Sequence, residues 1–146
     1  MLVIDEGQKL SAENLEILRT LLNYETNDQK LLQLVIFAQL ELLPVLEPVR
    51  NFTDRITFKQ RLQPLDAYET GQMIEFRLRK AGYNAPESLF SPGAVKSIYE
   101  NTRGYPRQIA RLCHNALEWL IMHDATLVSE DIIEKIIQRE NNWNAA

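Results

Sequence analysis

This sequence of 146 residues has almost no cysteine and few histidines. Cys113 is the single cysteine, so no disulfide can form within the chain, and no cysteine and histidine cluster has the spacing of zinc ligands. No basic and then apolar leader opens the sequence, and no apolar run approaches the length that spans a bilayer. We therefore expect a cytoplasmic chain, without structural zinc, in which this segment does not insert directly into a membrane.

Positive charge is also scarce. Lys and Arg number 16 against 20 for Asp and Glu, which gives a net charge of −4. This balance disfavours broad electrostatic attraction to nucleic acid, although a local basic strip is compatible with it. The hydrophobic share of 45% is that of an ordinary globular protein. The length suits one domain, or a small α/β piece followed by a helical subdomain.

The beginning of the chain has the pattern of a parallel sheet. Met1–Ile4 is a short apolar run that ends in Asp5 and Glu6, as a fully buried strand with acids at its carboxyl end would. An amphipathic helix and a second apolar strand, Leu31–Phe37, follow. Strand, helix and strand at this spacing predict a right-handed crossover. It would bring Asp5, Glu6 and Gln39 to one edge of the sheet, where ligands bind.

The segments around the second strand have weaker patterns. Ser11 is a candidate cap for the first helix, and Leu40–Leu46 allows a short helix interrupted by Pro44. The segment Arg50–Arg55 is polar, and alternation over Ile56–Phe58 predicts a third, more exposed strand. The apolar positions expected on one face of the first helix are Leu15, Leu18, Leu21 and Leu22.

After Pro64 the apolar period changes from two to 3.6, which predicts four helices. The expected caps or first residues of these helices are Asp66, Ser91, Pro106 and Ser129. Glu69 completes a capping box with Asp66, and Gly82 is a stop signal for the first of the four. The third has the clearest apolar face, made of Ile109, Leu112, Cys113, Ala116, Leu117, Leu120 and Ile121. The predicted layout is α/β over residues 1–63 and all-α over residues 64–146.

Two sequence features contain residues that could bind or hydrolyse a nucleotide phosphate. An apolar strand that ends in Asp5-Glu6 fits the second hydrolysis motif of P-loop ATPases, in which the aspartate orders the Mg²⁺ shell and the glutamate orients water. The alternative is two acids that end a strand and face solvent. Gly104-Tyr105-Pro106-Arg107 places an arginine in the first turn of a helix, where it can reach a nucleotide phosphate or simply be solvated.

Taken together, five motifs resemble the ExeA/general secretion pathway protein A family of AAA+ ATPases. The order and spacing of these motifs match over nearly the whole chain, and transposition ATPases of the TniB type share much of the pattern. The motifs are Leu-Val-Ile-Asp-Glu-Gly-Gln-Lys-Leu at 2–10, Ala-Gln-Leu-Glu-Leu at 38–42, Arg-Ile-Thr at 55–57, Pro-Leu-Asp at 64–66 and Gly-Tyr-Pro-Arg at 104–107.

The resemblance implies a partial AAA+ (P-loop NTPase) parallel sheet, with Walker B, sensor 1 and the arginine-finger region in residues 1–63, followed by a four-helix lid. It implies that Asp5, which would bind Mg²⁺, and the catalytic Glu6 form the Walker B pair. It also implies that Gln39 takes the sensor 1 position and Arg107 the sensor 2 position, and that both residues bind ATP.

The resemblance also implies an arginine that reaches the ATP of the next subunit in a homo-oligomeric ring. Arg55 is the expected catalytic finger and Arg50 the alternative. An alternative interpretation gives neither arginine a catalytic role. Together with Lys59 and Arg61, these arginines would only line the solvated side of an edge strand, where positive charge discourages unwanted pairing.

The sequence departs from the family in two places. Ala38 precedes Gln39 where relatives often carry glycine, and no Gly-x-x-x-x-Gly-Lys-Ser/Thr loop is present to cradle phosphates. We therefore expect a fragment, a truncated gene product or a deliberately shortened chain whose N-terminal ATPase half is its missing partner. ATP and Mg²⁺ would bind only with that half, and the chain alone would not hydrolyse ATP. The protein or DNA cargo is open. The alternative function is a non-catalytic helical module that binds protein or DNA.

Overall fold

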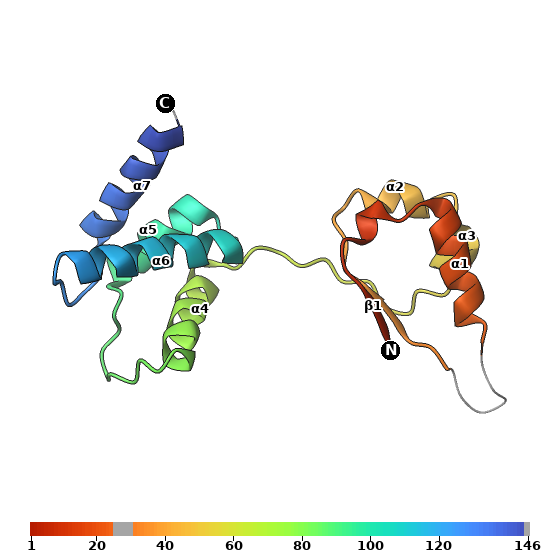
Figure 1. The fold of residues 1–146 in the computed structure, drawn as a ribbon, viewed down its shortest axis with the longest axis horizontal. Coiled ribbons are helices and arrows are strands. Elements are labelled where there is room, and N and C mark those ends of the chain that lie inside the picture. Colours follow the sequence, from red (N-terminus) through yellow and green to blue (C-terminus); the bar gives the residue numbers. More distant parts are fainter. Residues whose placement is uncertain (25–30, 145–146) are drawn as a thin grey trace. The chain divides into compact units, whose positions relative to one another are not determined.

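The computed structural model describes residues 1–24 and 31–144. It consists of two compact units, Met1–Arg61 and Leu62–Ala146 (Figure 1). The division lies close to the boundary between residues 63 and 64 expected from the change in apolar period. Unit 1 contains β1 (Leu2–Ile4), the 3₁₀ helix η1 (Gly7–Lys9), α1 (Ala12–Leu22), β2 (Leu34–Ile36), α2 (Leu42–Leu46) and α3 (Arg50–Thr53).

The two strands of unit 1 pair in parallel, as the strand–helix–strand pattern predicts. Leu2 lies opposite Leu34, and Ile4 lies opposite Ile36. The expectation that both strands are fully buried is wrong. Ile4, Leu34 and Ile36 pack against the helices, whereas Val3 and Val35 are exposed. Successive side chains of a strand point to opposite faces, and the described helices bury only one face of this sheet.

A small apolar core connects the helices of unit 1 to the inner face of the sheet. Ser11 caps α1 in a capping box, because its Oγ accepts the N–H of Asn14 while the Asn14 side chain accepts the N–H of Ser11. Leu15 and Leu18 are buried as expected, but Leu21 is exposed. The buried residues of this core are Leu15, Leu18, Leu42, Leu46, Val49 and Phe52.

The segment after α2 differs from its prediction. Residues expected to form only a polar connection include the helix α3, which Phe52 anchors by being 2% exposed. The predicted third strand at Ile56–Phe58 is absent from the described structure, where the sheet has the order β1–β2. Ile56 packs against the core of unit 1, while Phe58 is 77% exposed. Alternating side chains alone do not form a strand, because a strand also needs a neighbour for its backbone groups.

Unit 2 contains the four predicted helices, α4 (Ala67–Lys80), α5 (Pro92–Thr102), α6 (Pro106–Met122) and α7 (Glu130–Asn144). The caps predicted for the first two are confirmed. Asp66 and Glu69 form the capping box of α4, and the Ser91 Oγ accepts the N–H of Ala94 at the start of α5. These side chains accept backbone N–H groups that have no partner within the helix.

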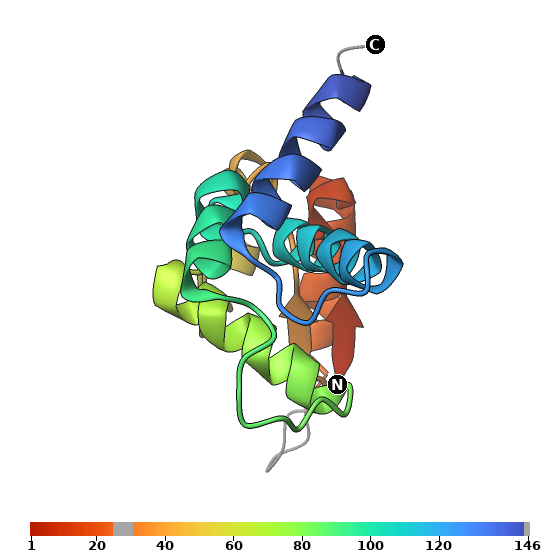
Figure 2. The ribbon, with the colours of Figure 1, turned by 90° about the vertical axis from the view of Figure 1, so that its left-hand side faces the viewer.

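The helices of unit 2 share one core, in which α7 packs against both α5 and α6 (Figure 2). Phe90 and Val128, on the connections before α5 and α7, form an isolated parallel bridge in its centre. On the predicted apolar face of α6, Ile109, Leu112 and Ala116 are buried, and Cys113, Leu117 and Leu120 are partly buried against the core. Ile121, in the last turn of the helix, is 77% exposed. No helix in residues 1–24 and 31–144 is long and apolar enough to cross a bilayer.

Candidate functional site

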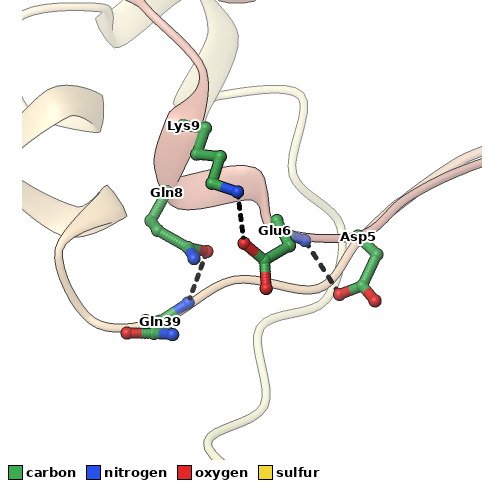
Figure 3. Close-up of polar contacts among 5 residues, drawn as sticks. All are labelled: Asp5, Glu6, Gln8, Lys9 and Gln39. Atoms are coloured by element: carbon green, nitrogen blue, oxygen red, sulfur yellow. Dashed lines mark hydrogen bonds and ion pairs between the residues drawn. The ribbon is translucent and has the colours of Figure 1, made fainter.

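Hydrogen bonds hold together the carboxyl ends of β1 and β2, where the sequence predicts a ligand site. The N–H of Phe37 donates to the carbonyl of Ile4 at 2.8 Å, and the N–H of Gly7 donates to the carbonyl of Phe37 at 2.8 Å. The N–H of Gln39 then donates to Oε1 of Gln8 at 3.2 Å (Figure 3). The turns after both strands therefore form a single polar edge.

The turn after β1 lies so close to β2 that only glycine fits at position 7. Gly7 is buried, and a Cβ added there would overlap the side chain of Ile36 and come within 3.2 Å of the Cβ of Ala38. A residue with a side chain would push the turn after β1 away from β2. Gly7 therefore sets the distance between the residues after β1 and those after β2.

The two acids after β1 lie on this edge in a constrained turn. Oδ1 of Asp5 accepts the N–H of Glu6 at 2.8 Å. Glu6 adopts φ 59° and ψ 36°, a left-handed conformation that is uncommon outside glycine. Its carboxylate pairs with Nζ of Lys9 at 2.7 Å, and both side chains are largely exposed (Figure 3). An exposed pair of this kind is weak, so the carboxylate of Glu6 can exchange Lys9 for another partner at little cost.

The arginines proposed as fingers lie around α3. Arg50 is the first residue of this helix, and the N–H of Arg55 donates to the carbonyl of Phe52 just after its end, at 3.0 Å. Both arginine side chains are exposed, and neither forms an ion pair within the described residues. Arg50 also lines an open hollow together with Glu13 and Glu16 of α1. The structure joins neither arginine to Asp5 or Glu6.

Arg107 belongs to unit 2, where an unusual turn sets the start of α6. Arg103 and Gly104 adopt φ 53° and 77°, and the carbonyl of Gly104 accepts the N–H of Leu65 at 2.9 Å. A Cβ on Gly104 would overlap the carbonyl of Leu65, so this position requires glycine for both its φ and its contact. The chain then enters α6 at Pro106, which leaves Arg107 exposed in the first turn.

The sequence did not predict a role for three residues of these turns. Gln8 holds the backbone of Gln39, Lys9 pairs with Glu6, and Arg103 supplies the left-handed residue that ends α5. The sequence offers only a weak signal for each. A polar residue in a loop has many possible partners, and the partner of Gln8 is 31 positions away.

The polar edge has donors for part of a magnesium site. Asp5 is exposed and supplies a carboxylate, the ligand type that Mg²⁺ prefers. No group of three or more His, Cys, Asp or Glu side chains in the described part of the chain is arranged to hold a metal ion. Mg²⁺ usually binds one or two carboxylates together with substrate phosphates and water, so Asp5 fits such a shared site and cannot form a closed one.

Comparison with known proteins finds a family model, a curated relative and a solved structure that are similar to this chain. A family model described as "AAA domain" matches residues 1–46. General secretion pathway protein A of Aeromonas hydrophila is 37% identical over 119 residues, which are 80% of this chain and 21% of that protein. The chain thus spans about a fifth of this curated relative. A solved structure of a RuvB mutant from Thermotoga maritima has a TM-score of 0.73, covering 94% of this chain and 43% of RuvB, at 20% identity. That likeness shows the fold alone.

Proposed function

We propose that this chain forms the second part of an ATP-hydrolysing module. The chain is homologous to General secretion pathway protein A and has the fold of a partial AAA+ ATPase with a helical lid. The resemblance found in its motifs is thereby confirmed. Unit 1 contributes the acids and the sensor at the sheet edge. Unit 2 contributes the lid. The whole relative is much longer, so the activity of the intact protein is part of the proposal.

The observation that carries this proposal is the single polar edge formed by the turns after β1 and β2. Asp5 would hold Mg²⁺ through its exposed carboxylate, and Glu6 would orient the water that attacks the γ-phosphate. Gln39, which the bond to Gln8 holds in the turn after β2, senses the state of the nucleotide. When bound, ATP and Mg²⁺ supply the phosphoryl group and the charge that neutralises its oxygens.

Two further roles involve arginines. Arg107, at the first turn of the lid helix α6, contacts a nucleotide phosphate and couples the lid to it. Arg55, with Arg50 as the alternative, stabilises the charge that develops on the γ-phosphate in a neighbouring subunit of a ring. Arg55 follows the short helix α3, whose buried Phe52 gives it a fixed base.

A phosphate-binding loop is needed for this reaction, and we propose that residues beyond those of this chain supply it. Two carboxylates and an arginine cannot replace a cradle of backbone N–H groups. The chain alone should therefore bind Mg-ATP very weakly and show no measurable turnover. We further propose that the intact protein acts in the cytoplasm as a homo-oligomeric ring on a protein or DNA cargo, in secretion, assembly or transposition.

The test compares two variants in the full-length ATPase that contains this segment. Glu6→Gln keeps the shape of the side chain but cannot polarise water, so turnover should fall by a factor of roughly 10²–10⁴ while Mg-ATP affinity is largely retained. Glu13→Gln is the matched control, because Glu13 is an exposed acid on α1 outside the polar edge. Wild-type hydrolysis by Glu6→Gln would show that the assignment of Glu6 is wrong. Micromolar binding of Mg-ATP by the chain alone, measured by calorimetry, would contradict the need for an external cradle.

A further inference from the structure

Gln8 joins the turn after β1 to the turn after β2 through its side chain. It is the middle residue of η1, which follows Asp5 and Glu6 directly and contacts α2. Oε1 of Gln8 accepts the N–H of Gln39 at 3.2 Å, across 31 positions of the sequence (Figure 3). One half-buried side chain therefore connects the segment of the two acids to the segment of the proposed sensor.

The backbone of Gln39 is held from two sides. Its N–H donates to Gln8, and its carbonyl accepts the N–H of Leu42 at 3.1 Å, at the start of α2. Leu42 is buried in the core of unit 1, so this second bond ties Gln39 to a packed helix. The side chain of Gln39 stays exposed at the polar edge. The two bonds thus fix the backbone of Gln39 and leave its side chain available for a ligand.

In the described part of the chain, the backbone bonds between the two turns end before Gln39. The last of them joins the N–H of Gly7 to the carbonyl of Phe37, and residues 37–39 have no regular secondary structure. A backbone N–H in an exposed segment can bond to water instead, so the bond with Gln8 contributes little to the stability of the fold. Its main effect is to restrict where Gln39 lies relative to the turn after β1.

We propose that Gln8 is a positioning residue for ATP hydrolysis, which acts by holding Gln39 at a fixed place relative to Glu6. This inference rests on the proposed function, in which Gln39 senses the nucleotide and Glu6 orients the attacking water. Gln8 does not touch the nucleotide, and its whole effect on turnover passes through Gln39. A displacement of about 1 Å in an active site can lower the rate roughly a hundredfold, so one hydrogen bond of this kind has a measurable effect.

The role requires a hydrogen-bond acceptor at the end of the side chain at position 8. The glutamine amide provides this acceptor through Oε1, and a glutamate carboxylate has an oxygen at the same distance from the backbone. A leucine also fills space beside α2 but has no acceptor. Gln8→Leu and Gln8→Glu therefore separate the loss of the bond from the loss of the glutamine itself.

The first measurement is hydrogen exchange at the amide of Gln39, followed by nuclear magnetic resonance in the chain alone. Gln8→Leu should raise this exchange rate by a factor of roughly 2–10, the equivalent of one hydrogen bond. Gln8→Glu at pH 7 should leave the rate near that of the original chain, because the carboxylate still accepts the N–H. An unchanged rate in Gln8→Leu overturns the proposal, since the bond would then not hold Gln39. This measurement does not depend on ATP.

The second measurement is turnover in the full-length ATPase that contains this segment. Gln8→Leu should lower kcat roughly 10–100-fold and leave the affinity for Mg-ATP largely unchanged. The same substitution in a Gln39→Ala background should cause little further loss, because the side chain that Gln8 positions is already absent. A residue that merely supports the fold would lower kcat by the same factor in both backgrounds. That outcome, or a normal kcat in Gln8→Leu, overturns the proposal.

Gln33→Leu is the matched control. Gln33 is an exposed glutamine of the same unit, and it precedes β2 at the end opposite Gln39. This variant should keep both the exchange rate of Gln39 and turnover, and a loss of turnover as large as that of Gln8→Leu would contradict a specific role for Gln8. Glu6→Gln separates the two proposals. If it stops turnover and Gln8→Leu does not, only the role of Gln8 fails, whereas wild-type turnover in Glu6→Gln refutes both.

Discussion

Gly104→Ala should destabilise unit 2 more than any exposed alanine substitution in it. The native residue has φ 77°, and its carbonyl accepts the N–H of Leu65 at 2.9 Å. An added Cβ would overlap the carbonyl of Leu65, which is backbone and cannot move aside as a flexible side chain can. The segment around Leu65 must therefore separate from the turn between α5 and α6.

The expected magnitude has two parts. A left-handed conformation costs a residue with a Cβ roughly 1–2 kcal/mol relative to glycine. Loss of the bond between Leu65 and Gly104 adds about 0.5–1.5 kcal/mol. Gly104→Ala should thus lower the free energy of unfolding by roughly 1.5–3.5 kcal/mol, and the midpoint of thermal unfolding of unit 2 by roughly 6–28 °C. Urea titration and calorimetry measure these two quantities.

Gly82→Ala is the matched control for this substitution. Gly82 also has a positive φ, 98°, but nothing lies within 4 Å of an added Cβ. It should show the conformational cost alone, roughly 1–2 kcal/mol. The difference between the two variants isolates the contact with Leu65. A Gly104→Ala variant no less stable than Gly82→Ala would refute the reasoning.

Two further predictions concern unit 2. Asp66→Ala removes the oxygen that accepts the N–H of Glu69 at 2.8 Å, so urea unfolding should show a loss of about 1 kcal/mol, and Asp66→Asn should retain most of it. Burial raises the pKa of Cys113 from 9.0 to about 12, opposed by the nearby Arg77. Between these two pH values the folded protein therefore keeps the Cys113 proton, which the unfolded chain releases. The stability that the buried, protonated thiol contributes is complete below pH 9 and is lost as the pH rises toward 12. Cys113→Ala should reduce the fall in urea midpoint between pH 8 and pH 11; an unchanged fall would contradict this. A thiol reagent at pH 8 should react slowly until urea unfolds unit 2.

The sequence by itself determined the helices of unit 2 and the parallel pair of unit 1. Caps such as Asp66 and Ser91 act within one turn of their own position, and an apolar period of 3.6 defines a buried face whatever the partner is. The same local character made the pairing of β1 with β2 predictable, because an apolar strand, a helix and a second apolar strand follow one another closely.

Tertiary structure alone decided which residues found a partner. Ile56–Phe58 alternates like a strand but has no neighbouring strand in the described structure, and Ile121 continues the apolar face of α6 but is 77% exposed. The bond from Gln39 to Gln8 and the need for glycine at position 104 depend in the same way on segments far apart in the sequence. Propensity and capping act over a few residues, whereas a hydrogen-bond partner, a close contact or an exposed edge exists only once the chain has brought distant residues together.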